Sequence, residues 1–379
     1  MTDVCDFQGG SQPPKDEWSL DENDGYVRML QIRDFTQSER VTPEYIKVSN
    51  STKMCNSDDI LLARYGASVG KILTGLSGAY NVAIMKSIPD EEIITKQFLY
   101  YYFKSPYFQT NILSVGVRAA QAGFNKEDLS KLEIKCPDKD TQRKICNDLK
   151  LVEGVISKRK KQLVELDTLI KARFVEMFGD PLAGTEKWSF QTVGDVADSV
   201  DPQPSHRTPP VVEGGIPYVS MKDCNYKNGT IDFAGARKVS PDVLVEHHNR
   251  YELHNGDFII GKIGTIGNPI FVPKRDDYAL SANVVLIQPN SSKVSPYFLK
   301  ETFESSFVER QFLDAKNSTS QAAFGIKKVR NIKIMNPDMK TQMEFENFAI
   351  QVDKLKVEVQ KSLDEMQILF DSLMQEYFG

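Results

Sequence analysis

One long helical segment occurs twice in this chain, and this duplication is the strongest constraint on the fold. The first copy covers residues 141–179 and the second covers 341–379, so equivalent positions are 200 residues apart without a gap. Both copies begin with Thr-Gln and end with Phe-Gly. At ~1.5 Å per residue, each copy would form a helix of roughly 57 Å, which is longer than most globular helices. A helix of this length needs a partner, and the other copy is the obvious candidate.

Apolar residues recur along both copies in alternating steps of four and three. This spacing is typical of the heptad seam of a coiled coil rather than of a broad amphipathic face. The sequence therefore predicts that the two helices pair along this seam. The seam residues are Ile145, Leu149, Val152, Ile156, Leu163, Leu166 and Ile170 in the first copy and Phe345, Val352, Val359, Leu363, Met366, Phe370 and Leu373 in the second.

Three charged residues interrupt the predicted seam. Arg159, Arg173 and Lys356 each stand where the other copy has an apolar residue. A polar residue at a single seam position can fix the register of a coiled coil at a cost in stability. The alternatives are defects in the core and contacts with another subunit, and the sequence leaves these interpretations open.

The composition is that of an ordinary globular protein. The 379 residues suffice for one to three domains, and 26% charged and 40% hydrophobic residues are typical values. The net charge of −5 counts only mildly against DNA binding, because local fields decide binding. The five Cys form no Cys-x-x-Cys pair, and no apolar run approaches the ~20 residues of a membrane span. We therefore expect reduced thiols, no signal peptide and no membrane segment, in a cytoplasmic protein.

The segments that precede the two helices repeat one order of elements, which predicts an α+β fold for each. Their alignment also sets Asn283 opposite Asn81. Strand-like sequences and a following helix occur at 25–35, 58–72, 78–87 and 95–113 in the first segment, and at 214–224, 256–272, 280–287 and 295–305 in the second. The predicted layout is a globular domain at 1–137, a long helix at 138–180, a second globular domain at 181–337 and a second long helix at 338–379.

No catalytic or metal site is complete in the sequence. Gly66 to Lys71 is similar to a phosphate-binding loop, but only three residues separate its glycines and Ile72 follows the lysine. Asn336-Pro337 lacks the second proline and the aromatic residue of an adenine methyltransferase motif. The four His are not spaced with Cys or carboxylates as a zinc site requires. The sequence predicts a protein with no catalysis and no metal of its own.

Polar side chains cluster at two equivalent places in each globular segment, and we consider them candidates for DNA contact. Gln and Arg can read base edges bidentately, whereas Lys and Ser can hold phosphates. The alternative for any one of them is a surface polar residue near a turn. The candidates are Arg64, Tyr65, Ser68, Lys71, Lys262 and Thr265, which follow a buried strand, and Arg118, Gln121, Ser320 and Gln321, which lie in the loop before the last strand.

Taken together, these segments resemble the specificity subunit of type I restriction–modification systems. The resemblance rests on LLARYGASVGKI and FIIGKIGTIGN, on the helix starts IKCPDKDTQRKI and IKIMNPDMKTQMEF, and on KWSFQTVGDVADSV in the second half. Their order, twice over at a near-constant interval, is specific and extends over essentially all 379 residues. One departure is at the start, where the first domain lacks a counterpart of the lead-in Trp188 to Val193 or builds it differently.

The resemblance implies an architecture of two tandem target recognition domains, each followed by a long helix. The two helices would pair as an antiparallel coiled coil with pseudo-two-fold symmetry. Each domain would read one half of a split, asymmetric site in double-stranded DNA, and the coiled coil would set the unread spacer between the half-sites. The chain would direct adenine methylation and restriction, as a phage defence, without catalysis of its own.

The resemblance also implies partners and the cofactors that they hold. Two modification (methyltransferase) subunits would bind the two repeats, and restriction (translocase and nuclease) subunits would join that core. S-adenosylmethionine, ATP and Mg would belong to these partners, with no cofactor in this chain. Two other functions remain possible from the residues alone. One is a scaffold whose coiled coil joins two protein-binding domains, and the other is an enzyme with an unrecognised site.

Overall fold

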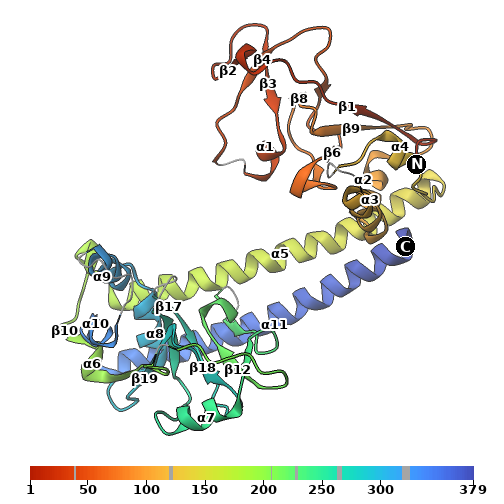
Figure 1. The fold of residues 1–379 in the computed structure, drawn as a ribbon. Coiled ribbons are helices and arrows are strands. Elements are labelled where there is room, and N and C mark those ends of the chain that lie inside the picture. Colours follow the sequence, from red (N-terminus) through yellow and green to blue (C-terminus); the bar gives the residue numbers. More distant parts are fainter. Residues whose placement is uncertain (38–39, 119–122, 206, 227–228, 263–266, 318–324) are drawn as a thin grey trace. The chain divides into compact units, whose positions relative to one another are not determined.

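The computed structural model describes residues 1–37, 40–118, 123–205, 207–226, 229–262, 267–317 and 325–379. The described chain divides into two compact units. The first unit consists of Met1–Arg159 with Ser362–Gly379, and the second consists of Lys160–Lys361. Each unit therefore holds one globular part and a stretch of each of two long helices, α5 (Lys139–Phe178) and α11 (Met339–Phe378) (Figure 1).

The globular part of the first unit contains two sheets, with strand orders β1-β9-β6-β7 and β2-β4-β3-β8-β5. The first sheet is antiparallel throughout, whereas β3 and β8 of the second run parallel. The strands are β1 (Cys5–Gly9), β2 (Trp18–Ser19), β3 (Tyr26–Leu30), β4 (Tyr45–Lys47), β5 (Met54–Cys55), β6 (Leu61–Ala63), β7 (Ile72–Leu73), β8 (Gly78–Tyr80) and β9 (Ile84–Pro89). The helices are η1 (Lys15–Glu17), α1 (Ile32–Thr36), η3 (Gly66–Ser68), α2 (Lys96–Lys104), α3 (Pro106–Arg118) and α4 (Lys126–Ser130).

The globular part of the second unit is built around a sheet of the same kind, with strand order β11-β19-β16-β17. Smaller sheets have the orders β15-β12-β18, β10-β20 and β13-β14. The strands are β10 (Phe190–Thr192), β11 (Ala197–Val200), β12 (Ile216–Val219), β13 (Cys224–Asn225), β14 (Thr230–Ile231), β15 (Arg237–Val239), β16 (Phe258–Gly261), β17 (Gly267–Phe271), β18 (Ala279–Leu280), β19 (Val284–Pro289) and β20 (Lys333–Met335). The helices are η4 (Pro181–Ala183), α6 (Val193–Val196), η5 (Met221–Asp223), α7 (Pro241–His248), α8 (Pro296–Glu304), α9 (Ser306–Asn317) and α10 (Ile326–Arg330).

The backbone ladders show which residues of the two repeats are equivalent. Beyond the end of β6, the backbone N–H of residue 64 donates to Ala83 O at 2.8 Å, and beyond β16 that of residue 262 donates to Asn283 O at 2.8 Å. Asn283 is thus the counterpart of Ala83, and Ser281 is the counterpart of Asn81. The sequence alignment of Asn283 with Asn81 is wrong by two residues, because it follows a shared Asn-Val pair while the ladder fixes the register.

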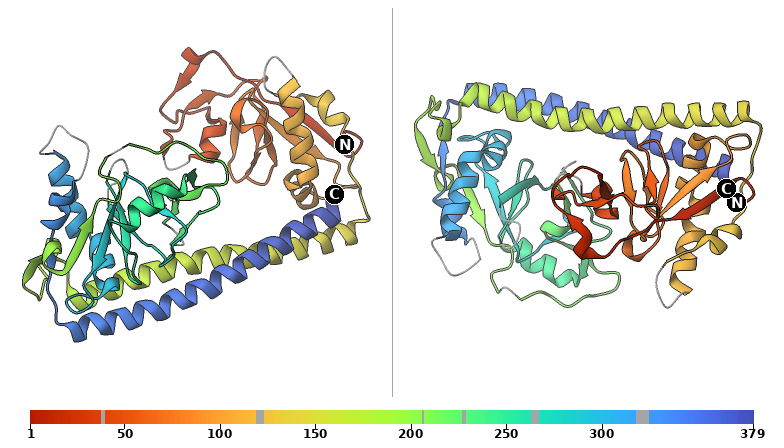
Figure 2. Two further views of the ribbon diagram at one scale, coloured as in Figure 1. Left: turned by 60° about the horizontal axis from the view of Figure 1, so that its bottom comes forward. Right: turned by 90° about the horizontal axis from the view of Figure 1, so that it is seen from above.

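The two long helices run antiparallel in each unit. In the first unit, the Phe378 ring near the end of α11 lies 5.0 Å from Phe98, in a core that also holds Ile145 near the start of α5. In the second unit, the Phe178 ring at the end of α5 lies 5.6 Å from Phe345 near the start of α11. Figures 1 and 2 show α5 and α11 side by side along their length. The predicted α+β fold with two long, antiparallel helices is confirmed.

The repeated Thr-Gln at the helix starts has a structural role in both units. Gln142 and Gln342 are completely buried. The Gln342 side-chain oxygen accepts a hydrogen bond from Ser295 N at 2.9 Å, and its Nε2 donates to Pro337 O at 2.8 Å. Gln142 bonds in the same way with Thr95 N and Pro137 O, each at 2.9 Å. Thr95 and Ser295 are the N-caps of α2 and α8, so each Gln joins the start of one of these helices to the start of a long helix. Each Gln also satisfies buried backbone groups that need a hydrogen-bond partner.

An aspartate caps each long helix. Asp138 Oδ1 accepts from Thr141 N at 2.9 Å, and Asp338 Oδ1 accepts from Thr341 N at 2.9 Å. These backbone hydrogen bonds, with a second from each Thr hydroxyl, hold the pKa of both carboxyls below the usual value. The closing Phe-Gly has a matching role, since Gly179 has a φ of 83° and ends α5 in the left-handed conformation that favours glycine.

Met1 of the first unit takes the place that Val193 has in the second. In the second unit, Val193 N donates to Ile332 O at 2.9 Å. In the first unit, the Met1 amino group donates to the equivalent carbonyl of Leu132 at 2.9 Å, and Met1 is buried. The β10-β20 pair of the second unit, in which Phe190 lies opposite Met335, has no counterpart among the described strands of the first. Both units thus satisfy the equivalent carbonyl group, that of Leu132 or Ile332, with a nitrogen donor.

The predicted seam residues of α5 and α11 are all buried or half-buried. Of the seam charges, Lys356 has its Nζ 2.6 Å from Asp167 Oδ1 on the other helix, within the second unit. Arg173 pairs with Glu176 on its own helix at 2.8 Å, and its guanidinium lies 5.8 Å from the centre of the Phe348 ring. Lys356 thus links the two helices by charge, which favours a role in register for this residue.

The buried glutamine predicts a measurable stability difference between two positions of one helix. We expect Gln342→Met to lower the free energy of unfolding by about 2–4 kcal/mol, since a similar volume is kept while two buried backbone groups lose their partners. Urea unfolding followed by circular dichroism measures this. Gln351→Met, at an exposed position of α11, is the control and should change stability by less than about 0.5 kcal/mol. Equal effects of the two changes would contradict the role of Gln342.

Candidate nucleic-acid interface

The first group of candidate residues surrounds the turn that follows β6. The backbone of this turn closes on the strand, because Ala63 N donates to Lys71 O at 2.9 Å and Gly70 N donates to Ala63 O at 3.0 Å. Gly70 has a φ of 81°, which a side chain would strain. The structure therefore brings Arg64, Tyr65, Ser68 and Lys71 together in the β6-β7 hairpin, as the sequence suggests.

The side chains of this hairpin differ in exposure. Tyr65 is 39% exposed, Lys71 is exposed, and Ser68 is half-buried. Arg64 is half-buried, and its Nε donates to Phe124 O at 3.2 Å. The guanidinium carbon of Arg64 also lies 4.9 Å from the centre of the Tyr65 ring. This arrangement presents a cation, an aromatic ring and an ammonium group on neighbouring surface, which are the groups that contact phosphates and bases.

The equivalent cation of the second unit is placed differently. Lys262 follows β16, and its side chain is only 6% exposed. Its Nζ lies 2.6 Å from Asp201 Oδ2. Thr265, Ser320, Gln321 and Gln121 lie outside the described residues, and Arg118 is the last residue of α3, where only the backbone is described. The DNA contacts proposed for these residues therefore stay predictions.

A polar hollow in the second unit was not found from the sequence. It has a volume of 560 Å³ and lies beside β12 and the turn before β19, with Tyr218, Ser220, Lys222, Arg237 and Asn283 in its lining. Arg237 donates through an η nitrogen to Pro209 O at 2.7 Å. Apart from Asn283, these residues fall where the two repeats differ most in length, so the comparison of the repeats carries no signal for them.

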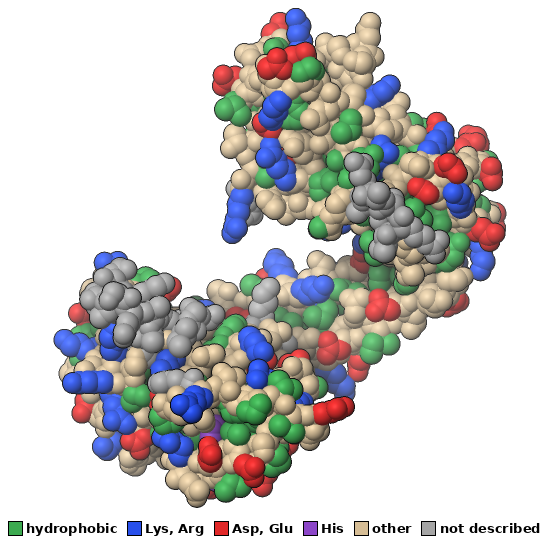
Figure 3. Space-filling model, viewed as in Figure 1, with side chains coloured by type: hydrophobic (Ala, Val, Ile, Leu, Met, Phe, Trp, Pro, Cys, Tyr) green, Lys and Arg blue, Asp and Glu red, His purple; other side chains and the backbone are tan. Residues whose placement is uncertain are grey.

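Charge on the surface is mixed. On the face drawn in Figure 3, Lys and Arg side chains are interspersed with Asp and Glu side chains. Within the described residues there is no group of three or more His, Cys, Asp or Glu that could hold a metal ion. Likewise, none of the helices described is long and apolar enough to cross a membrane.

The buried histidine of the second unit is a structural residue. His247 Nε2 lies 2.8 Å from Gln203 Oε1, and its Nδ1 lies 3.0 Å from the Tyr251 hydroxyl. Burial, with a smaller effect from Arg250, lowers the pKa of His247 to about 4. The neutral ring is held by these two hydrogen bonds, and its nitrogens are occupied.

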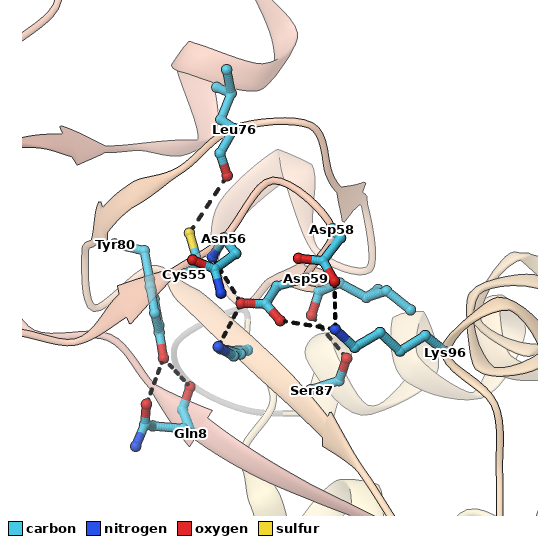
Figure 4. Close-up of polar contacts among 11 residues, drawn as sticks. Gln8, Cys55, Asn56, Asp58, Asp59, Leu76, Tyr80, Ser87 and Lys96 are labelled. Carbon is cyan, nitrogen blue, oxygen red and sulfur yellow. Dashed lines mark hydrogen bonds and ion pairs between the residues drawn. The ribbon is translucent and has the colours of Figure 1, made fainter. Parts of the chain in front are cut away.

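A cluster of carboxylates and ammonium groups precedes β6 in the first unit (Figure 4). Lys96 Nζ lies 2.7 Å from Asp58 Oδ2 and 3.6 Å from Asp59 Oδ1, and Lys86 Nζ lies 2.5 Å from Asp59 Oδ2. Asp59 also accepts from Asn56 N at 2.8 Å. Burial alone would raise the pKa of Asp59, but the hydrogen bonds from Lys86 and Asn56 outweigh it and hold the pKa below its usual value. The cluster is a set of ion pairs that closes a turn.

The equivalent carboxylate of the second unit has no close ammonium partner among the residues that the structure describes. Asp257 accepts from His254 N at 2.8 Å and from Gln288 Nε2 at 2.7 Å. The strand pairing places Leu286 where the first unit has Lys86, so the second unit has no lysine at that position. Burial raises the pKa of Asp257, and the hydrogen bonds from His254 and Gln288 only partly offset it. The two units thus use the same turn with opposite effects on the carboxyl group.

Comparison with known proteins gives consistent matches. A family model described as type I restriction modification DNA specificity domain matches residues 1–166 and again residues 185–366. The chain is 19% identical over 342 residues to the type I restriction enzyme MjaVIII specificity subunit of Methanocaldococcus jannaschii, covering 86% of this chain and 79% of that protein.

Two solved structures have a similar fold. One is a type I restriction-modification system S subunit from M. genitalium, with a TM-score of 0.58 and 14% identity, covering 100% of this chain and 94% of that one. The other is a chain of a type I R-M system described for its complex assembly and conformational transition, with a TM-score of 0.54 and 15% identity, covering 99% and 97%. At these identities the structures support the fold alone.

The two equivalent aspartates predict opposite responses to loss of charge. Asp59 has a lowered pKa, so its contribution is present above the unfolded pKa of ~4 and is lost as the pH falls through the folded pKa. Asp257 has a raised pKa, so its contribution is present below the unfolded pKa and is lost as the pH rises through the folded pKa.

At pH 7 we therefore expect Asp59→Asn to lower the free energy of unfolding by about 1–3 kcal/mol, because Lys86 is left without its anion. Asp257→Asn should be neutral or stabilising by less than about 1 kcal/mol, since the amide keeps an acceptor for His254 N. Urea unfolding of the two variants at pH 7 gives the comparison, and a loss of stability in Asp257→Asn as large as in Asp59→Asn would refute it.

Proposed function

Because the chain belongs to the family of type I restriction-modification specificity subunits, we propose that it reads a two-part, asymmetric DNA site for partner subunits. As a specificity subunit it recognises DNA sequence and is not itself an enzyme. In the proposal, each unit reads one half of the site in double-stranded DNA. The partner subunits carry out adenine methylation and cleavage at the sites so chosen.

One observation carries the proposal: a single fold is present twice with different side chains at equivalent positions. Lys86 of the first unit corresponds to Leu286 of the second, and Arg64 corresponds to Lys262. A duplicated frame with divergent polar residues is what two readers of different half-sites require, because base readout depends on the side chains that reach the groove. The frame itself is common to both units, down to the buried Gln at each helix start.

In the first unit we assign DNA contact to the β6-β7 hairpin. Tyr65 and Lys71 are exposed there, and Arg64 is half-buried and anchored through its Nε. In the second unit the polar hollow beside β12 is the corresponding candidate, because Lys222 and Asn283 at its rim are exposed. Arg118, Gln121, Thr265, Ser320 and Gln321 remain further candidates.

The paired helices α5 and α11 serve in this proposal as the ruler between the half-sites. Two readers that bind one face of DNA need a separation that matches the helical repeat of about 34–36 Å. The antiparallel contacts within each unit, together with the Lys356–Asp167 ion pair of the second unit, support the pairing of the two helices. Changing the length of the pair therefore changes the number of unread base pairs.

Partners complete the proposed assembly. Two modification subunits would each bind one repeat and hold S-adenosylmethionine, and restriction subunits would add ATP and Mg for translocation and cleavage. The net charge of −5 fits such an assembly, because partners can supply much of the phosphate neutralisation. The cytoplasm, where the DNA and these partners meet, is the proposed location.

Methylation mapping tests the proposed function. Long-read sequencing of genomic DNA, with and without this chain, should reveal methylated adenines in one bipartite motif that is lost when the chain is absent. Replacement of residues 1–137 by the equivalent domain of a relative should change one half of the motif and leave the other half and the spacer intact. An unchanged methylation pattern in the absence of the chain would exclude the proposal.

Partner dependence of DNA affinity gives a separate test. We expect weak binding of a cognate duplex by the chain alone and at least tenfold tighter binding once the methyltransferase partner is added, because the partner brings further phosphate contacts. Fluorescence anisotropy with a labelled duplex measures both affinities. Equal affinity with and without the partner would argue against shared neutralisation.

A further inference from the structure

The two repeats place different residues beside the strand-end cation, which is Arg64 after β6 in the first unit and Lys262 after β16 in the second. In the first sheet, β1 pairs with β9 so that Cys5 lies opposite Pro89 and Gly9 opposite Met85. In the second, β11 pairs with β19 so that Ala197 lies opposite Pro289. Counting from these pairs, Gly9 of the first unit is the counterpart of Asp201 in the second. Arg64 and Lys262 are likewise counterparts, at the ends of β6 and β16.

In the second unit this pair of positions forms an ion pair that is shielded from solvent. Lys262 Nζ and Asp201 Oδ2 are 2.6 Å apart, and the two side chains are only 6% and 17% exposed. The charges cancel, and the ammonium group is already desolvated and bound. A phosphate could reach this lysine only by separating the pair, which would leave a buried carboxylate without its partner.

In the first unit the same place holds a cation without a carboxylate. No ion pair of Arg64 occurs among the described residues, and its Nε donates to the carbonyl of Phe124 at 3.2 Å. A Cβ atom built on Gly9 would lie 3.2 Å from Nη1 of Arg64. A side chain at position 9 would therefore meet the guanidinium, as Asp201 meets Lys262. Glycine at this position supplies no carboxylate, and none of the described residues pairs with Arg64 in its place.

We propose that Arg64 is a DNA phosphate contact of the first repeat and that Asp201 removes the equivalent contact from the second. The proposal rests on the DNA-recognition function. A guanidinium held through Nε keeps both η nitrogens for a phosphate, and hydrogen bonds between ionised groups are the strong ones. The exposed Lys71 of the same hairpin adds a second cation to this surface. The residue at position 9 or 201 thus decides whether the strand-end cation is structural or binds DNA.

The test uses the full chain and two labelled 40-bp duplexes of unrelated mixed sequence, with affinity measured by anisotropy over a range of KCl concentrations. Loss of one phosphate contact lowers the slope of log affinity against log salt by about one. We expect this for Arg64→Ala and for Gly9→Asp, with the same three- to tenfold loss of affinity on both duplexes. Gly9→Asn, which has the size of the aspartate without its charge, should stay within about twofold of the wild type.

A double-mutant cycle separates pairing from general repulsion. Gly9→Asp should have little effect in the Arg64→Ala background, because the charge it cancels is already gone. Lys262→Met serves as the matched change in the second unit: it should lower the melting temperature while the salt slope stays as in the wild type. Thermal melting of every variant identifies any that do not fold, and the Gly9→Asn and Gly9→Asp pair keeps the comparison isosteric.

The outcomes distinguish this proposal from the function on which it rests. Salt-dependent binding by the wild type with an unchanged slope in Arg64→Ala overturns the phosphate contact and leaves the function standing. A change of preference between the two duplexes in Arg64→Ala overturns the assignment to phosphate. A reduced slope in Lys262→Met overturns the structural role of Asp201. No duplex binding by the wild type, at concentrations up to the ~10⁻⁴ M range of non-specific binding, overturns both proposals.

Discussion

The structure depends on the burial of the ends of α5 and α11 in the globular cores. Each core contains the start of the long helix that follows it and the end of the other long helix. In the first unit Phe378 packs on Phe98, and in the second Phe178 packs on Phe298 with ring centres 4.7 Å apart. Neither globular part completes its core without both helices, so folding of each unit and pairing of the helices are one process.

This dependence explains why the helix ends are the best-preserved parts of the repeat. The buried Gln at each start satisfies two backbone groups, and the Asp before it caps the helix. Gly179, which follows the final Phe of α5, has the left-handed conformation that ends this helix where Phe178 enters the core. Positions with obligatory partners of this kind tolerate little change, because a lost partner leaves a buried polar group unpaired.

The two units differ in their side chains at positions where no buried backbone group needs a particular hydrogen-bond partner. The ion pair with Lys86 helps to lower the pKa of Asp59, whereas burial raises the pKa of the equivalent Asp257 despite the hydrogen bond from Gln288. Likewise, Lys262 has a carboxylate partner in Asp201, where the first unit has Gly9. These differences lie on or next to the equivalent four-stranded sheets, of which each unit has one. A duplicated specificity subunit can in this way vary its readers without altering the contacts that join reader and helix.

The sequence by itself determined the duplication, the long paired helices and the α+β class, because a heptad seam and an order of elements are local patterns that repetition makes certain. It also located Arg64 and Lys71 at one turn, since the strand and its glycines are adjacent in the chain. Only the tertiary structure decided three features. These are the strand register that makes Asn283 the counterpart of Ala83 rather than of Asn81, the ion pair of Lys262 with Asp201, and the hollow beside β12. Each of these features depends on contacts between residues that are far apart in the sequence. Strand pairing across the sheet decides which of them meet.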